Sequence, residues 1–559
     1  MFNSKKKELW KNDVNTSTSG TGSTTTDNAF INAGMKKTSE TLSGNGALKY
    51  ENHTDVFVTQ FNMLGTYKAP RTFEQIEKDQ EVLWSENKLL TVAFSLFLRM
   101  ITRKTNVFGK MTDEPQRGGE LKHEGIMRML WLHFKSPETF WKNIILFVTV
   151  GSWKDVFTML RYDLVHHGWD ERKLDWTKFG KLILAGLKDD TQRELIKKYL
   201  PQIKAKSNCK TVESQANTMI AKWLCSLLYG NKNNGSYKLY RKLKTSGTAH
   251  EWQKLISQGK HDLIDFDTIH GRALNLLVRS KYLNNNNLTD KYANWIQKDT
   301  TEAKYTGFVH ELFQSLPRSL SYLDNNKRDT INKQFETLVN KAKGSNDRNT
   351  SLIVVRDTSG SMGSTANGTN MSSNKIAKSM ALYFSEFLTG KFENAWIEFN
   401  NTAKMHKWKG RTVLEKWYND NSDYVGSTNF LSVVKLFAKI KQQGVNESEF
   451  PTGILCISDG EFNPGQLGKT NVESAKDILR NAGFSNTYVK NFVICLWNIP
   501  NYYYSNSTPK FETFDDVPNV FYMSGYSASI VQFLMNGVKT AKELFLEAMN
   551  QEVLNLVEL

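Results

Sequence analysis

The sequence predicts an α plus α/β protein, with an N-terminal all-α domain of HEAT-like helical repeats and a doubly wound α/β domain after it. Residues 50–345 carry apolar positions at helical spacing and almost no strand-like alternation. After residue 350, apolar strands alternate with amphipathic helices, which is typical of a mostly parallel sheet. The polar segment GSNDRNT, residues 344–350, separates the two patterns and is expected to be the linker.

The domain boundaries follow from changes in composition along the 559 residues. Residues 1–46 are predicted to be a disordered tail, because this Ser-, Thr- and Gly-rich stretch cannot bury enough apolar surface to fold. A basic helical domain is expected over 47–345 and the α/β domain over 346–535. Residues 536–559 are predicted to form a C-terminal helix, which could pack on the α/β domain or return to the helical one.

Several helices of the first domain have clear start signals. A long helical stretch covers 73–100, and Ser136-Pro137 places a capping Ser before a first-turn Pro. Ser152 and Asp155 fit a capping box. Further helices are expected at 176–199, 211–229, 234–245, 268–282, 288–315 and 328–343. Such a series of short helices favours a solenoid of antiparallel pairs, although no strict sequence period accompanies it.

The second domain is predicted to have six strands and four helices. The strands are expected at 351–356, 395–399, 404–409, 453–458, 491–497 and 519–524. The helices are expected at 374–388, 411–419, 429–441 and 471–481. Helices should cover both faces of this sheet. Ligands of such sheets bind beyond the carboxyl ends of the strands.

Oxygen-bearing side chains follow two of these strands and begin one helix. Asp357, Ser359 and Ser361 follow the first strand, Thr428 lies at the start of a helix, and Asp459 follows the strand 453–458. Such oxygens suit a hard divalent cation that keeps some water, with Mg²⁺ as the default and Mn²⁺ or Ca²⁺ as alternatives. Asp and Ser after a strand often merely cap a helix, so the ordered set of three segments carries this prediction.

The order DxSxS, then GxT, then a strand ending in SDG resembles the metal-ion-dependent adhesion site (MIDAS) of von Willebrand factor A domains. The resemblance implies that Ser359, Ser361 and Thr428 coordinate the cation directly. It implies that Asp357 and Asp459 do so directly or through water, and that one position stays open for a carboxylate of a partner protein. The chain departs from the pattern at Ser427, where these domains often have Gly.

A basic helical module followed by such a domain resembles the Ro autoantigen family, with its TROVE-type architecture, whose ring-shaped helical module binds small non-coding RNAs. A poorly characterised family of plants and large DNA viruses is similar over more of the chain. That similarity includes residues 43–61, Arg117-Gly118-Gly119, residues 150–156, and the segments DTSGSM, GSTNF and ISDGEF. Most of residues 43–535 is covered. The resemblance to Ro implies a ring or arc of helices with basic surfaces that contact RNA.

The net charge of +16 is unevenly distributed. Residues 351–559 hold 19 Lys and Arg against 20 Asp and Glu, so the preceding part carries all the excess positive charge. This favours a polyanion partner, with structured or small non-coding RNA as the leading candidate, or simply a solvated basic surface. The candidate RNA contacts are Arg117, Lys122, Arg128, Lys238, Arg241, Lys242, Lys244, Arg272, Arg279 and Lys281.

Other classes of protein find little support. HExxH and GxxxxGK[ST] motifs are absent, which favours a non-enzymatic binding scaffold. The scattered cysteines, the missing signal peptide and the lack of an apolar run near the roughly 20 residues of a membrane span predict a soluble cytoplasmic protein, cellular or viral. The sequence leaves two functions open: an RNA-binding scaffold, or a protein–protein adaptor or particle-assembly component with no RNA role. The oligomeric state is open too.

Overall fold

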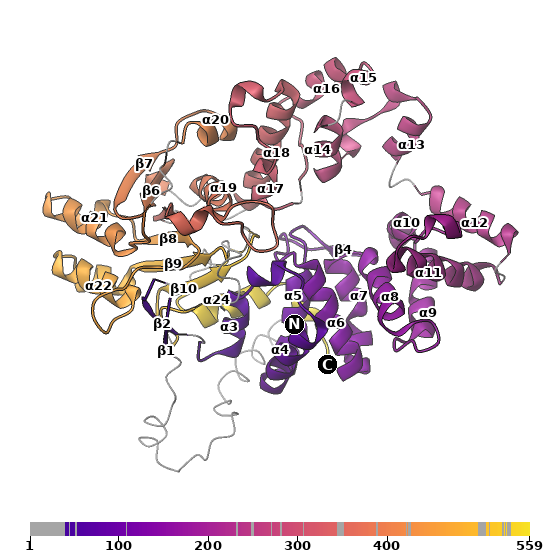
Figure 1. Ribbon diagram of the computed structural model, residues 1–559, viewed down its shortest axis with the longest axis horizontal. Helices are drawn as coiled ribbons and strands as arrows, with labels where there is room; N and C mark the ends of the chain where they lie inside the picture. Colours follow the sequence, from indigo (N-terminus) through magenta and orange to yellow (C-terminus); the bar gives the residue numbers. More distant parts are fainter. Residues whose placement is uncertain are drawn as a thin grey trace, which may run out of the picture.

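The computed structural model describes residues 40–559 except 44, 51–52, 108, 231–232, 248–250, 270, 280–281, 306, 344–350, 387–389, 421, 423–425, 501–509, 514, 528–529, 531–532 and 534–537. Residues 56–343 form a helical module, and residues 351–524 form a sheet module beside it (Figure 1). The structure therefore confirms the predicted α plus α/β class as a helical region followed by a region with a mixed sheet. Within the described ranges, no helix has the length and apolarity needed to cross a membrane.

The helical module consists of helices of 4 to 19 residues. They are α3 (Val56–Asn62), α4 (Phe73–Glu86), α5 (Lys88–Arg99), α6 (Lys122–Lys135), α7 (Pro137–Val150), α8 (Trp153–His167), α9 (Trp176–Lys188), α10 (Asp190–Tyr199), α11 (Val212–Tyr229), α12 (Asn234–Thr245), α13 (Glu251–Ser257), α14 (Gly271–Arg279), α15 (Tyr282–Asn285), α16 (Thr289–Ile296), α17 (Val309–Phe313) and α18 (Asn325–Lys343). Two hairpin strands, β3 (Asn106–Val107) and β4 (Lys110–Met111), lie between α5 and α6.

Two of the predicted helices are each split by a capping residue. The stretch 73–100 breaks at Asn87, whose side chain accepts the N–H of Leu90 at 2.9 Å and starts α5. The stretch 176–199 breaks in the same way at Asp189, which accepts the N–H of Thr191 at 2.8 Å. A side chain that satisfies the first free N–H groups of a helix favours a new start there, even where the apolar pattern runs on.

The helical module forms an arc with both ends on the sheet module (Figure 1). Helices α4 to α12 lead away from the sheet, and α13 to α18 return to it. On the returning limb a separate small core gathers around Phe266, Tyr292 and Trp295. The arc agrees with the expected overall arrangement, whereas the HEAT-like repeat within it stays a prediction.

The sheet module is built on six strands in the order β10-β9-β8-β5-β6-β7, all parallel except the edge strand β7. The strands are β5 (Leu352–Asp357), β6 (Ala395–Phe399), β7 (Ala403–Lys407), β8 (Gly453–Ser458), β9 (Val493–Asn498) and β10 (Val520–Ser524). The main helices are α19 (Ser373–Ser385), α20 (Val413–Tyr418), α21 (Leu431–Gln442), α22 (Asn471–Asn481) and α23 (Asn486–Asn491). Every residue of β5, β8 and β10 is buried, so both faces of the central sheet are covered.

The first described residues pack on the sheet module. Strands β1 (Glu40–Leu42) and β2 (Leu48–Tyr50) form an antiparallel hairpin, and Tyr50 exchanges backbone hydrogen bonds of 2.8 Å with Phe511. Ser43 donates its hydroxyl to the carbonyl of Phe462 at 3.0 Å. Residues 40–43, which were expected to belong to the tail, therefore lie in a hairpin that is stabilised by partners far along the chain, whereas residues 1–39 of the expected tail lie outside the described residues.

The C-terminal segment packs on the helical module. Helix α24 (Ala541–Met549) is shorter than the predicted 536–559 and contacts α3, α5 and β10. The ring of Phe545 lies 5.3 Å from that of Phe57 and 5.7 Å from that of Phe94. Beyond α24, the side-chain amide of Gln551 donates to the carbonyl of Arg117 at 2.8 Å. The segment therefore contacts both modules, which combines the two placements expected for it.

Candidate metal centre

The first candidate segment follows β5 at the carboxyl edge of the sheet. Asp357 ends the strand fully buried, and its Oδ1 accepts the N–H of Ser359 at 2.8 Å. Its Oδ2 accepts the hydroxyl of Ser458 at 2.5 Å. The hydroxyl oxygens of Ser359 and Ser361 lie 3.1 Å apart. These contacts hold one carboxylate and two hydroxyls close together at this edge.

The second segment carries Thr428 and is tied to the first through the backbone. The N–H of Gly360 donates to the carbonyl of Gly426 at 3.1 Å. Thr428 is 1% exposed, and its carbonyl accepts the N–H of Asn463 at 2.9 Å, which holds this loop beside the segment that follows β8.

The third segment follows β8 and carries Asp459, which is 8% exposed. Its Oδ1 accepts the N–H of Glu461 at 3.3 Å, and the hydroxyl of Ser361 hydrogen-bonds to its carboxylate. Ser361 therefore links the first segment to the third. The N-terminal hairpin also reaches this loop, because the Lys49 ammonium donates to the carbonyl of Gly460.

Ser427, the departure from the adhesion-site pattern, belongs to the rim of this region. Its hydroxyl donates to Oδ1 of Asn401 at 2.8 Å and accepts from the amide of Asn463 at 3.0 Å. Gly426 before it has φ +102°, and a Cβ there would lie 2.8 Å from Asn401 Oδ1. The loop therefore directs the Ser427 hydroxyl to these amides and requires glycine at 426.

The two carboxylates lie in surroundings that disfavour their charge. Burial raises the pKa of Asp357 to about 7, and the negative charge of Asp459 adds to the effect. Burial also raises the pKa of Asp459, although the hydrogen bond from Ser361 opposes this. Two buried carboxylates side by side repel each other, and a cation between them would remove that cost.

The donor set fits a hard cation. Carboxylates and hydroxyls are oxygen ligands of the kind that Mg²⁺ and Ca²⁺ prefer. Within the described ranges, no three His, Cys, Asp or Glu side chains gather closely enough to hold a metal ion. A cation at this edge would therefore depend on the hydroxyls of Ser359, Ser361 and Thr428 as well as on the two carboxylates.

Some of the candidate RNA-binding side chains are engaged inside the protein. Arg128 is fully buried and donates to Glu124 Oε1 at 2.9 Å and to Gln80 Oε1 at 2.7 Å. Arg117 donates to the carbonyl of Pro115 at 3.0 Å. These two arginines are structural, because their guanidinium groups face protein acceptors.

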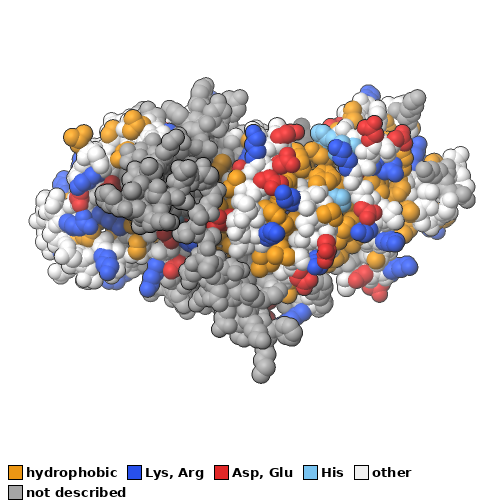
Figure 2. All heavy atoms as spheres, turned by 90° about the horizontal axis from the view of Figure 1, so that it is seen from below, with side chains coloured by type: hydrophobic (Ala, Val, Ile, Leu, Met, Phe, Trp, Pro, Cys, Tyr) orange, Lys and Arg blue, Asp and Glu red, His pale blue; other side chains and the backbone are white. Residues whose placement is uncertain are grey.

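The other candidate RNA contacts differ in exposure. Lys122 and Lys244 are half-buried, whereas Lys238, Arg241 and Lys242 are exposed on α12. The side chains of Arg272, Arg279 and Lys281 lie outside the described residues. On the face drawn in Figure 2, Lys and Arg side chains are scattered among acidic and hydrophobic ones. The basic excess therefore does not gather into one patch on that face.

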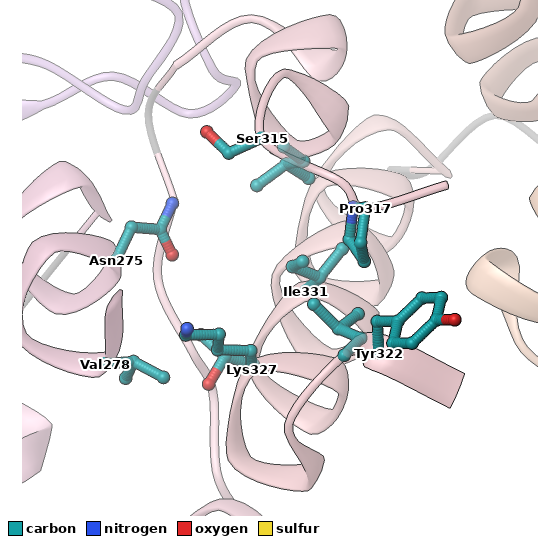
Figure 3. A pocket seen from close by; sticks show the side chains of 10 residues that line it. Asn275, Val278, Ser315, Pro317, Tyr322, Lys327 and Ile331 are labelled. Atoms are coloured by element: carbon teal, nitrogen blue, oxygen red, sulfur yellow. The ribbon is translucent and has the colours of Figure 1, made fainter. Parts of the chain in front are cut away.

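A small hollow of about 280 Å³ lies away from the sheet, between α14, α17 and α18 (Figure 3). Asn275 and Lys327 direct polar atoms toward it, and Val278 and Ile331 give it an apolar lining. None of the predicted site residues lines this hollow.

A family of domains and a solved structure are similar to parts of this chain. Residues 351–555 match a family described as a domain of unknown function (DUF7788). No curated protein matches the chain. Among solved structures, the chain is similar to the crystal structure of the Ro (RSR) protein of Deinococcus radiodurans, with 11% identity and a TM-score of 0.38, over 74% of this chain and 88% of that one. A likeness this weak assigns no function.

Proposed function

We propose that the sheet module binds a divalent cation, Mg²⁺ by default, and through it one carboxylate of a partner protein. The ligands would be Asp357, Ser359, Ser361, Thr428 and Asp459, and the whole chain would act as a non-enzymatic binding scaffold. The observation that carries this proposal is the convergence of the three segments at one edge of the sheet, where Ser361 hydrogen-bonds to Asp459, its hydroxyl lies 3.1 Å from that of Ser359, and the loop before Thr428 bonds to Gly360.

The chemistry of the ligands supports a role in binding. Three of the five groups are neutral hydroxyls, so the two carboxylates at most balance the charge of a divalent cation. When bound, the cation would supply a compact positive charge with an incomplete shell of hard oxygen ligands. An Asp or Glu of a partner is the natural group to complete that shell.

Calorimetric titration with MgCl₂ tests the cation site. Thr428→Val keeps the shape of the side chain and removes the hydroxyl, and we expect it to weaken binding by about tenfold or more. Ser427→Ala is the matched control, because that hydroxyl is bonded to Asn401 and Asn463. A Thr428→Val protein that binds Mg²⁺ as well as the wild type would reject the site.

Recovery of partner proteins in Mg²⁺ and in EDTA tests the carboxylate step. Partners should be lost in EDTA, return with Mg²⁺, and be absent for Asp357→Ala. Partner binding that survives both chelation and Asp357→Ala would reject this step while leaving the cation site intact.

A second candidate function is RNA binding by the helical module, favoured by the exposed basic side chains of α12. Fluorescence anisotropy with a structured RNA should show affinity that falls steeply with salt. Lys238→Gln with Lys242→Gln should lower the salt slope by about 2, since each phosphate contact contributes about 1. Lys435→Gln with Lys439→Gln, an equally spaced exposed pair on α21, is the control. Absence of binding at low salt would reject this function.

A further inference from the structure

A cavity of about 590 Å³ lies between the outgoing and returning limbs of the helical module. Residues from α5, α10 and the start of α6 line one side, and residues from α14 and the loop before α17 line the other. Four of the lining side chains are basic. They are Lys68, Arg99, Lys122 and Lys198.

Fewer carboxylates than cations lie near the cavity. Glu120 belongs to the described lining, and Glu311 lies beside it, because its Oε2 would be 2.5 Å from a Cβ at Gly307. Behind the wall, Asp155 accepts from Arg99 Nε at 2.8 Å and lies 3.7 Å from the Lys122 ammonium, so one carboxylate serves two cations. Burial raises the pKa of Glu120 to about 7, which reduces its average negative charge at neutral pH.

Two further features of the wall favour an anion. Helix α6 begins at Lys122 in the lining, and no side chain caps its first turn, so the positive end of a 14-residue helix adds to the field. Burial lowers the pKa of Lys122 to about 8, with Asp155 opposing the shift and Lys154 and Arg99 adding to it. A bound anion would offset this accumulation of positive charge.

Part of the remaining lining is apolar. Ile101, Leu121 and Phe308 contribute to the wall, and the Lys68 ammonium lies 4.1 Å from the centre of the Phe308 ring. The volume falls within the roughly 300–1,000 Å³ of small-molecule sites. The combination of basic side chains with an apolar wall suits a ligand that has a phosphate at one end and an apolar group at the other.

We propose that this cavity binds a small phosphate-bearing solute of nucleotide size. Its phosphate would contact Lys122 and Lys198, and its apolar part would lie against Ile101 and Leu121. The site is separate from the candidate cation centre and does not depend on it.

Calorimetric titration of the full chain with AMP, adenosine and inorganic pyrophosphate tests this proposal. AMP should bind and adenosine should bind at least tenfold more weakly. Lys122→Gln and Lys198→Gln should each weaken AMP about tenfold, because a hydrogen bond to a charged group contributes roughly that much. Lys188→Gln, an exposed lysine on α9, is the control, and Thr428→Val should leave AMP binding unchanged.

Three results would overturn the proposal. One is equal binding of AMP and adenosine, and another is unaltered AMP binding in both cavity variants. The third is that neither AMP nor pyrophosphate binds at millimolar concentration. If a 5′-phosphorylated RNA binds in that case, the cavity belongs to an RNA-binding surface and the proposal is also rejected. Arg99 is left unchanged because its loss would leave Asp155 buried without its closest cation.

Discussion

Phe545→Ala tests whether α24 is part of the core of the helical module. The side chain is 1% exposed and contacts the rings of Phe57, Phe61 and Phe94 at centroid distances of 5.3, 5.9 and 5.7 Å. Truncation of a buried Phe costs about 3–5 kcal/mol, which is a large part of the roughly 5–15 kcal/mol that stabilises a typical domain. We therefore expect α3 and α5 to lose stability although the change lies on a helix at the far end of the chain.

Hydrogen–deuterium exchange read peptide by peptide is the assay, because it reports on α5 and on β10 separately. Phe545→Ala should accelerate exchange in α5, and urea unfolding should shift to lower concentration. Leu546→Ala is the control, since this neighbour is only half-buried and should cost about 1 kcal/mol. Faster exchange in β10 with α5 unaffected would refute the assignment of α24 to the helical core.

Three further predictions concern charged groups. Lys49→Met leaves the fully buried Glu512 carboxylate without its ammonium partner at 3.5 Å and should cost about 3–5 kcal/mol in urea unfolding, and adding Glu512→Gln should recover most of it. If the double variant is no more stable than the single one, the pair is not the cause. Burial raises the pKa of Glu120 to about 7, so the folded chain holds more protons than the unfolded one between about pH 4.5 and 7 and stability falls as pH rises through that window. Glu120→Gln should flatten this slope in melts at stepped pH, and an unchanged slope would contradict the assignment. Finally, Mg²⁺ at a hundred times its Kd should stabilise the wild type by about 2.7 kcal/mol relative to EDTA and leave Asp357→Ala unaffected, and equal gains in both would count against the cation site.

The sheet module could be predicted closely from its sequence. The predicted bounds of β6 and β8 agree with the structure to the residue, because both strands are mostly apolar and are flanked by polar residues. The three candidate ligand segments were found through their position directly after such strands or at the start of a helix. Their mutual contacts, such as the bond from Ser458 to Asp357, needed the structure because 101 positions separate the two residues.

The helical module shows where sequence patterns reach their limit. Arg128 counts as one more positive charge in the sequence, yet it is buried against Glu124 and against Gln80, which is 48 positions away. The hairpin at 40–50 reads as part of a polar tail, because its partners, such as Phe462, lie about four hundred positions further on. Charge counts and local periodicity carry no information about partners so distant in the chain.

The hairpin β1–β2 packs on the sheet module, and α24 packs on the helical module. This arrangement has a consequence for folding during biosynthesis. The hairpin made first must wait for the loop at Gly460–Phe462, and α3 and α5 must wait for Phe545, which leaves the ribosome after the whole sheet module. Neither module can therefore complete its core before the other has been synthesised, and the apolar faces of α3 and α5 stay exposed until α24 has been made. Cleavage of the finished chain between Lys343 and Ser351 should likewise leave two fragments that remain associated.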